Sequence, residues 1–247
     1  EKHDLVLGLK QTLNLEKLPR KIECFDISNL AGDYMVAGMC VAIDGVIKKN
    51  LSRRFKIKTV FTQDDPRCTE EVVTRRLKHS IENPKGGFGE LPNVIFADGG
   101  ITQIRAAKEA ISEIRKEIIK IDKKYDWSKV DIPIFGMVKD DKHTTRALIN
   151  ENREELPLSE NLMNVITQFQ DTVHDTAIGY HRKLRDGAIT KSVLDDIKGI
   201  GNVKKKELLK KFGSVEKIAK ADIDEISQIK GINEELAKNI KEQLNKM

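Results

Sequence analysis

Residues 94–100 are VIFADGG, a short apolar run that ends in one aspartate and two glycines. The run predicts a buried β-strand, and the two glycines predict a turn directly after it. A second apolar run follows at Ile132–Val138. Between the two runs, apolar residues recur at helical spacing at Ile101, Ile104, Ala107, Ile111, Ile114 and Ile118. Strand, helix and strand in this order predict a right-handed parallel crossover, and so an α/β fold.

Upstream of this unit, three apolar stretches predict consecutive antiparallel strands. The first is Lys21–Ser28, with the sequence KIECFDIS, and the second is Tyr34–Ile43. Asp44-Gly45 is a typical hairpin turn, and Val46–Ile57 is expected to form the third strand.

Other parts of the same region predict flanking helices. Amphipathic spacing is found at Thr69–Ile81 and again from Ser159 to about Lys183. Asn83–Glu90 has the composition of a loop, and Ala147–Ile149 is expected to be a short strand. The large domain is therefore predicted to be a mixed sheet with flanking helices.

The character of the chain changes after Arg185–Ser192, a small polar stretch that we expect to be a hinge. Two copies of a weak repeat follow, Leu194–Gly201 (LDDIKGIG) and Ile226–Asn233 (ISQIKGIN). Each copy precedes an amphipathic helix that is rich in lysine or glutamate. The C-terminal domain is therefore predicted to be small and all-α.

Composition narrows the function classes. The chain has 247 residues and a formal net charge of +5, and none of its apolar runs approaches the length that a membrane span needs. Three cysteines without CxxC spacing argue against a disulfide framework, so we expect a cytoplasmic protein. Residues 181–211 hold ten Lys or Arg against four Asp or Glu, a surplus of +6. Such a basic segment indicates an anionic polymer as the partner, although a solvated helix face would look the same.

Two aspartates at predicted strand ends are the strongest candidates for chemistry. Asp26 lies in a hydrophobic strand, where a lone carboxylate is costly, and Asp98 ends another strand. If the strands are neighbours, the two carboxylates converge and suit Mg²⁺ or Mn²⁺, which support phosphodiester cleavage. The alternative is that Asp26 caps a turn with Ser28 and that Asp98 caps the following helix. The spacing alone leaves both interpretations open.

His174 is a further candidate on a predicted helix. It shares the helix with Asp171, Asp175 and His181. Near a metal it could be a ligand, a general base or a phosphate partner. A lone helical histidine is more often a surface residue or a satisfied core residue.

The Gly199-Ile200-Gly201 segment has the form of a helix-hairpin-helix. Glycines allow the hairpin to approach a phosphate closely, and backbone N–H groups at the next helix bind the anion. Lys204, Lys205 and Lys206 add positive charge there. We expect Gly231 to serve the second hairpin, although Asn233 replaces its last glycine. A role in packing alone is the alternative.

With these residues laid out, the chain resembles the C-terminal half of the UvrC family, the bacterial excision-repair endonuclease subunit. The resemblance runs from about residue 18 to residue 240. The matching stretches are Ile22–Ser28, Arg53–Phe55, Asp64–Asp65, Asp98–Gly100 with Gln103, Val138–His143, His174, His181–Arg182 and the doubled hairpin.

The resemblance implies a ribonuclease H-like endonuclease domain at 1–187 and a tandem helix-hairpin-helix domain at 193–247. It implies that Asp26, Asp98 and His174 are catalytic and hold Mg²⁺ or Mn²⁺. It adds Asp65, or its neighbour Asp64, as functionally important. Lys139 matches a lysine that faces the site.

The resemblance also implies a role and partners. In that family the domain nicks damaged double-stranded DNA on the 5′ side of a lesion, in concert with UvrB and indirectly with UvrA. The UvrB-binding segment and a second nuclease lie upstream, which fits a fragment that begins at Glu1. Arg182, in the basic segment, joins Gly199, Gly201, Lys204, Lys205 and Gly231 as predicted DNA-binding residues.

Two positions depart from the family's pattern. Asn29 stands where the family usually has histidine, and Asp175 stands where an arginine usually follows the catalytic histidine. These departures support an alternative function, a DNA-binding module whose nuclease-like core is impaired. A third hypothesis is an RNA-hybrid nuclease of the same fold, but the hairpin tail argues against it.

Overall fold

The computed structural model describes the backbone of residues 2–29, 35–60, 63–86, 88–118, 126–185, 194, 197–213 and 215–245, and the side chains of these except 2, 180–185 and 216. The chain divides into two compact units, Glu1–Tyr180 and His181–Met247, each of which is treated by itself. Most of the predicted hinge lies outside the described residues. No helix in the described ranges is long and apolar enough to cross a bilayer.

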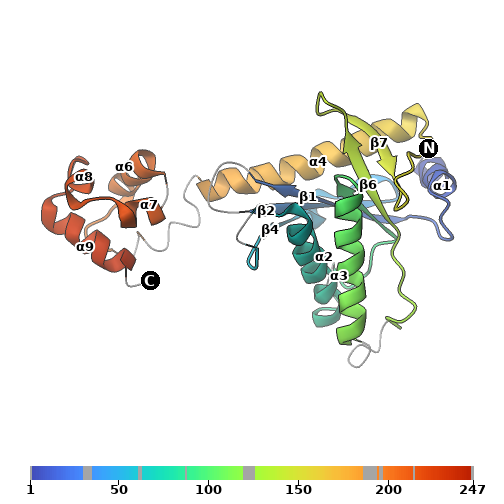
Figure 1. Ribbon diagram of the computed structural model, residues 1–247, viewed down its shortest axis with the longest axis horizontal. Helices are drawn as coiled ribbons and strands as arrows, with labels where there is room; N and C mark the ends of the chain where they lie inside the picture. The colour runs from blue at the N-terminus through green and yellow to red at the C-terminus, as the bar shows by residue number, and fades with distance from the viewer. Residues whose placement is uncertain are drawn as a thin grey trace. The chain divides into compact units, whose positions relative to one another are not determined.

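The first unit is built around one seven-stranded mixed sheet (Figure 1). Its strands follow the spatial order β3-β2-β1-β5-β6-β7, and β4 also pairs with β2. The strands are β1 (Lys21–Ser28), β2 (Val36–Ile43), β3 (Val46–Ile47), β4 (Arg53–Lys56), β5 (Val94–Asp98), β6 (Ile134–Lys139) and β7 (Thr145–Ile149). The helices are α1 (Lys2–Thr12), α2 (Asp65–Glu82), α3 (Ile101–Ile118) and α4 (Glu160–Arg185).

The register of the sheet confirms the two strongest predictions about topology. β1 and β2 are antiparallel, and β5 and β6 are parallel neighbours joined through α3. β1 and β5 are also parallel neighbours, with Phe25 opposite Ala97. The α/β prediction is therefore correct, and the two aspartate-bearing strands lie next to each other.

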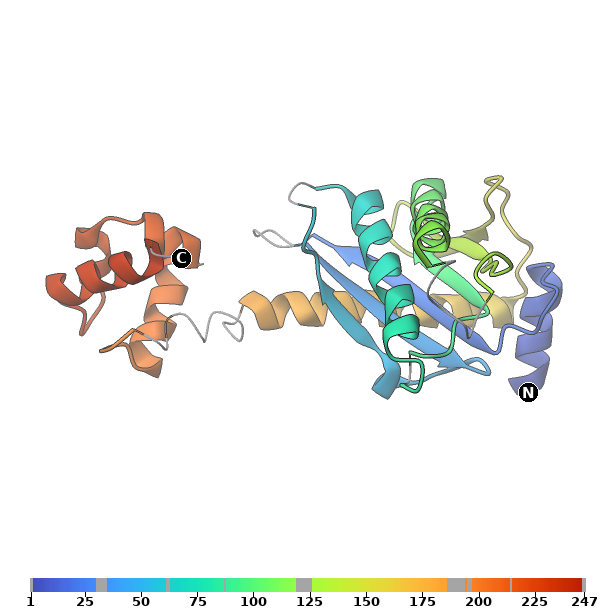
Figure 2. The ribbon, with the colours of Figure 1, turned by 90° about the horizontal axis from the view of Figure 1, so that it is seen from below.

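Helices cover both faces of this sheet, with α4 on one face and α2 and α3 on the other (Figures 1 and 2). Successive residues of a strand point to opposite faces, so β1 supplies both cores. Phe25 packs in the core under α2 and α3, while Cys24 packs in the core under α1 and α4.

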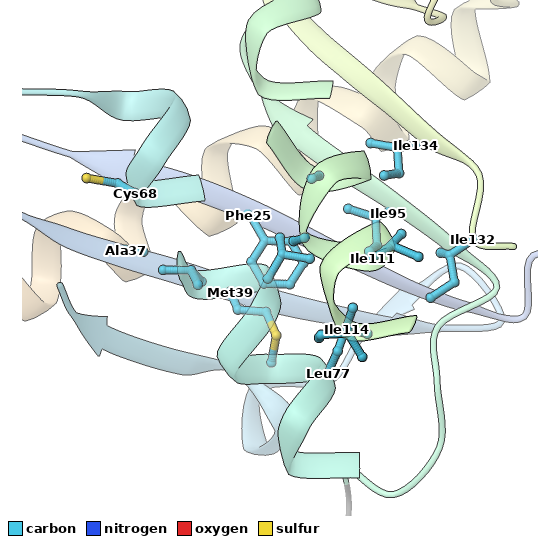
Figure 3. Close-up of a cluster of buried hydrophobic side chains, with 14 of the residues drawn as sticks. Phe25, Ala37, Met39, Cys68, Leu77, Ile95, Ile111, Ile114, Ile132 and Ile134 are labelled. Atoms are coloured by element: carbon cyan, nitrogen blue, oxygen red, sulfur yellow. The ribbon is translucent and has the colours of Figure 1, made fainter. Parts of the chain in front are cut away.

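The core under α2 and α3 is the larger of the two (Figure 3). Met39 and Ile95 of the sheet meet Leu77 of α2 and Ile114 of α3 there. Trp127, the one tryptophan in the sequence, closes this core at 1 % exposure. The core under α1 and α4 joins Leu9 of α1, and Leu13 directly after it, to Ile166, Phe169 and Val173 of α4.

A buried ion pair crosses the α2 side of the sheet. Arg76 of α2 is 1 % exposed and donates to both oxygens of Glu23 on β1, at 2.7–2.9 Å. Its guanidinium also donates to the carbonyls of Phe88 and Glu90, at 2.9 Å each. The pair therefore ties β1, α2 and the 83–90 loop together.

The prediction of one strand over Val46–Ile57 is wrong. The structure has β3, a 3-10 turn at Lys49–Leu51 and then β4, and both strands pair with β2. Lys48, Lys49 and Asn50 have low strand propensity and face solvent, so the ladder breaks there. Helix α1 was not predicted, although Val6, Leu9 and Leu13 have the spacing of a buried helical stripe.

The second unit is all-α, as predicted. It contains α6 (Asn202–Phe212), α7 (Val215–Lys220), α8 (Ile223–Ser227) and α9 (Glu234–Asn245). Its own core includes Ile197, Ile200, Ile229 and Ile232 of the repeat. Both copies of the repeat thus contribute matching isoleucines to the core.

Candidate active site

Asp26 and Asp98 lie side by side on adjacent parallel strands, one register step beyond the pair Phe25–Ala97. Asp26 is buried at 6 % exposure, and the side chain of Asp98 is 9 % exposed. A carboxylate in such a place needs partners, because burial without compensation is costly.

Helix α4 brings one residue to each carboxylate. Nδ1 of His174 lies 2.9 Å from Oδ2 of Asp26, and Nε2 of Gln170 donates to Oδ1 of Asp98 at 2.7 Å. The two side chains are four residues apart, so they lie on one face of the helix. The side chain of His174 is 46 % exposed, so a substrate can reach it.

Gly38 of β2 is what allows α4 to come so close. It lies opposite Asp26, and a Cβ there would stand 2.6 Å from the carbonyl oxygen of Val173 and 2.7 Å from the backbone nitrogen of Ala177. Any larger residue at this position would push α4 away from the sheet.

Lys139 of β6 reaches the same carboxylate pair. Its Nζ lies 2.9 Å from Oδ2 of Asp98. The two described partners of the Asp98 carboxylate are therefore the side chains of Lys139 and Gln170. The alternative prediction, that Asp98 caps the next helix, has no such bond among the described residues.

The electrostatics follow from this burial. Burial raises the pKa of Asp26 to about 6, and the nearby charge of Asp98 adds to that effect, while the hydrogen bond from His174 opposes it. The same hydrogen bond raises the pKa of His174, against the effect of desolvation. The Asp26 carboxyl and the His174 imidazole therefore both hold a proton to higher pH than they would in free solution.

Asp26, Asp98 and His174 form a triad that fits a divalent cation. One potential ligand atom from each lies within 4.8 Å of the others, and it is the one such group among the residues that the structure describes. Two carboxylate oxygens and an imidazole nitrogen suit Mg²⁺ or Mn²⁺.

Asp65 is not part of this triad. It begins α2, where Asp64 is the N-cap and accepts a hydrogen bond from the backbone N–H of Arg67. Burial raises the pKa of Asp65, and its Oδ1 has no hydrogen-bond partner in the described part of the chain. The structure therefore gives Asp65 a place at a helix start and not among the ligands.

Sequence reasoning missed Gln170 and Thr145. The hydroxyl of Thr145 donates to Oε1 of Gln170, whose Nε2 bonds Asp98. The four-residue spacing between Gln170 and His174 on one predicted helix could have indicated that Gln170 faces the same site.

The two hairpins of the second unit have the geometry expected of their glycines. Gly199 and Gly231 have φ angles of +95° and +86°, which favour glycine. Gly201 is the N-cap of α6, and a Cβ there would meet no atom within 4 Å. Lys204 donates to the carbonyl of Gly199 at 3.0 Å.

The prediction that Lys205 contacts DNA needs correction. Lys205 is 5 % exposed, because it lies three residues before buried Leu208 on the inner face of α6. Lys204 is half-buried and lines an open groove of about 900 Å³ with Lys198 and Gly231. Arg182 is on α4, and its side chain lies outside the described residues.

Comparison with known families agrees with both units. A family model described as "UvrC RNAse H endonuclease domain" matches residues 10–178. The chain belongs to the UvrC family. A second model, "SAM-like Helix-hairpin-helix tandem", matches residues 191–246. The predicted fold class, a ribonuclease H-like mixed sheet followed by tandem helix-hairpin-helices, is confirmed.

Curated relatives carry the name UvrABC system protein C. The protein from Clostridioides difficile is 43 % identical over 94 % of this chain and 35 % of its own length. The one from Clostridium tetani is 41 % identical over 95 % and 37 %. This chain thus spans just over a third of the length of the relatives it matches. The C-terminal lobe of a budding yeast Argonaute aligns over 64 % of this chain and 32 % of that chain, at 17 % identity and a TM-score of 0.33, too weak a likeness to argue from.

Proposed function

We propose that this chain is a divalent-metal-dependent DNA endonuclease of nucleotide excision repair, which makes the incision 5′ to a lesion in concert with UvrB. The observation that carries the proposal is the triad in which Asp26 and Asp98 lie on neighbouring strands and His174 reaches them from α4. Family membership supports a nuclease, and the names of the relatives support a place in excision repair.

Asp26 and Asp98 would hold the cation, and the Nε2 of His174 would either complete its ligand set or act on a proton. When bound, Mg²⁺ or Mn²⁺ activates a water molecule and stabilises the negative charge that develops on the phosphate. His174 donates through Nδ1 to ionised Asp26, which leaves the lone pair of Nε2 free to act outward. Its exposed ring is placed to accept or deliver a proton at the scissile phosphate.

Lys139 and the hairpins would bind and position the DNA. The ammonium of Lys139 orients Asp98 and adds positive charge beside the phosphate. In the second unit, Gly199, Gly201 and Gly231 would let the backbone approach the DNA phosphates, with Lys204 and Arg182 adding charge. Such contacts position the duplex without reading its sequence, so we expect the choice of lesion to come from partner proteins.

A nicking assay tests this function. The chain, joined to the upstream part of a relative, is given a lesion-containing duplex that is already nicked on the 3′ side and loaded with UvrB. Wild type is compared with Asp98→Ala and with the control Asp141→Ala, which removes an exposed acid after β6. We expect a metal-dependent 5′ nick from wild type and the control, and none from Asp98→Ala, although it still binds DNA.

Two outcomes would contradict the proposal. Full cleavage by Asp98→Ala would remove that residue from catalysis. No cleavage by any form, with DNA binding retained, would favour the impaired DNA-binding module and direct attention to Asp175, which lies beside His174.

A further inference from the structure

Gln170 is fully buried in the middle of α4, and its amide makes three hydrogen bonds. Nε2 donates to Oδ1 of Asp98 at 2.7 Å and to the carbonyl oxygen of Met137 at 3.0 Å. Oε1 accepts from the hydroxyl of Thr145. Both hydrogens of the amide and its oxygen are therefore in use.

These partners fix which way the amide points. The oxygens of Asp98 and Met137 are both acceptors, so they need the NH₂ end. The hydroxyl of Thr145 can donate, and it therefore selects the oxygen end. Thr145 on β7 thus holds the amide in the one orientation in which it can donate to Asp98.

A neutral donor is well suited to this position. Lys139 already brings one positive charge to Oδ2 of Asp98. A second cationic side chain there would repel a divalent cation at close range, since the interaction is strong away from water. An amide restrains the carboxylate without adding charge.

We propose that Gln170 is a positioning residue that sets the orientation of the Asp98 carboxylate toward the metal, and that Thr145 sets the orientation of Gln170. This inference rests on the proposed function, because it concerns the same site. Outer residues that orient a metal ligand typically change metal affinity about 10–100-fold when they are removed.

The competing explanation is that Gln170 only links α4 to the carbonyl of Met137 on β6. That structural role would change stability, but it would leave the Mn²⁺ affinity of the folded protein unchanged. Metal affinity therefore separates the two roles.

The test is calorimetric titration of the 247-residue chain with MnCl₂. The heat of binding that wild type shows and Asp98→Asn lacks is assigned to the triad. Gln170→Met keeps the length of the side chain and removes its hydrogen bonds. We expect it to weaken Mn²⁺ binding about 10–100-fold. The control Gln168→Met changes an exposed glutamine of the same helix and should bind as wild type does.

A second pair of variants keeps the test decisive if Gln170→Met does not fold. Thr145→Val has the same shape as threonine but no hydroxyl, and Thr145→Ser retains the hydroxyl. We expect Thr145→Val to weaken Mn²⁺ binding several-fold, and Thr145→Ser to restore most of the affinity.

The outcomes distinguish the two proposals. If Asp98→Asn loses Mn²⁺ binding while folded Gln170→Met and Thr145→Val keep wild-type affinity, the positioning role is wrong and the metal site stands. If wild type and Asp98→Asn bind Mn²⁺ equally, both the metal site and the positioning role are wrong.

Discussion

Asp26 shows at the scale of one residue how a functional group costs stability. Burial raises the pKa of its carboxyl from 3.8 to about 6, in spite of the hydrogen bond from His174. Between these pH values the folded chain binds more protons than the unfolded chain does. Stability therefore falls as the pH rises through this window, and ionised Asp26 destabilises the metal-free protein at pH 7.

Asp26→Asn should accordingly stabilise the metal-free protein at pH 7 while it removes activity. A rise from 3.8 to about 6 corresponds to about 2–3 kcal/mol at pH 7. We expect a higher urea midpoint at pH 7 and a smaller gain at pH 4, where the folded carboxyl is protonated and the unfolded one is about half protonated. Asp175→Asn, at an exposed position of α4, should change neither midpoint. An unchanged Asp26→Asn midpoint at pH 7 would contradict this account.

Individual site residues differed in how well sequence could find them. Asp26 and Asp98 stood out in the sequence, because each is a carboxylate in or at the end of an apolar strand, although the spacing alone left a capping role open. Gln170 and Thr145 were not, because amide and hydroxyl side chains on helices and strands are common and only the packing of α4 brings these two together. Lys205 was misplaced, because a run of three lysines hides which one lies on the inner face of α6.

At the scale of elements, the contact between β2 and α4 controls the site. A Cβ at Gly38 would meet backbone atoms of Val173 and Ala177, on either side of His174. Backbone atoms cannot rotate away as a side chain can, so the helix itself would have to shift.

Gly38→Ala should therefore cost about 1–3 kcal/mol of stability, the usual range for overpacking. It should also reduce nicking, because the displaced helix carries His174 away from Asp26. Gly8→Ala on α1 is the control, since its Cβ would meet only Leu162 side-chain atoms at 3.7–3.8 Å. Urea unfolding and the nicking assay measure both effects. Wild-type behaviour of Gly38→Ala would show that α4 is not held at this distance.

The buried pair of Arg76 and Glu23 is a second link between elements. Arg76→Met removes the main partner of the buried Glu23 carboxylate and leaves it with Nζ of Lys21, 3.8 Å away, so we expect a loss of about 3–5 kcal/mol. The double variant Glu23→Leu/Arg76→Met removes both charges and should recover most of that loss. Urea unfolding of the single and double variants measures the coupling. Additive losses would mean that the two side chains act independently.

The sequence predicted helices and strands well where a regular pattern of apolar residues extends over the whole element. Helix α3 and strand β5 were found with nearly their final bounds. The break between β3 and β4 was not predicted. Both strands have the alternating pattern of a β-strand, and the interruption depends on how each one pairs with β2. Helix α1 was missed, although its stripe of buried residues was present.

At the scale of the whole molecule, the proposed chemistry and the proposed DNA binding fall in different units. The triad lies in the first unit, and the proposed phosphate contacts lie mainly in the second. Variants of the hairpin should therefore change DNA affinity without changing Mn²⁺ binding.

Lys204→Ala should reduce the slope of log affinity against log salt by about 1, because one phosphate contact is lost. Gly201→Ala should weaken DNA binding with a stability loss of no more than about 1 kcal/mol, since alanine is a poorer N-cap than glycine but its methyl group meets no protein atom within 4 Å. Lys210→Ala, an exposed residue near the other end of α6, controls for net charge. Anisotropy titrations at several salt concentrations measure these effects. Equal slopes for wild type, Lys204→Ala and Lys210→Ala, together with wild-type affinity of Gly201→Ala, would indicate that the hairpin only packs.

Trp127, which closes the core under α2 and α3, allows the two units to be distinguished by intrinsic fluorescence. All three tyrosines also fall within residues 1–180, so residues 181–247 contain neither tryptophan nor tyrosine. Intrinsic fluorescence excited at the red edge of the indole band therefore follows the nuclease unit alone. Far-ultraviolet circular dichroism follows both units, because both are helical. A difference between the two melting curves would be the unfolding transition of the hairpin unit, observed without a label.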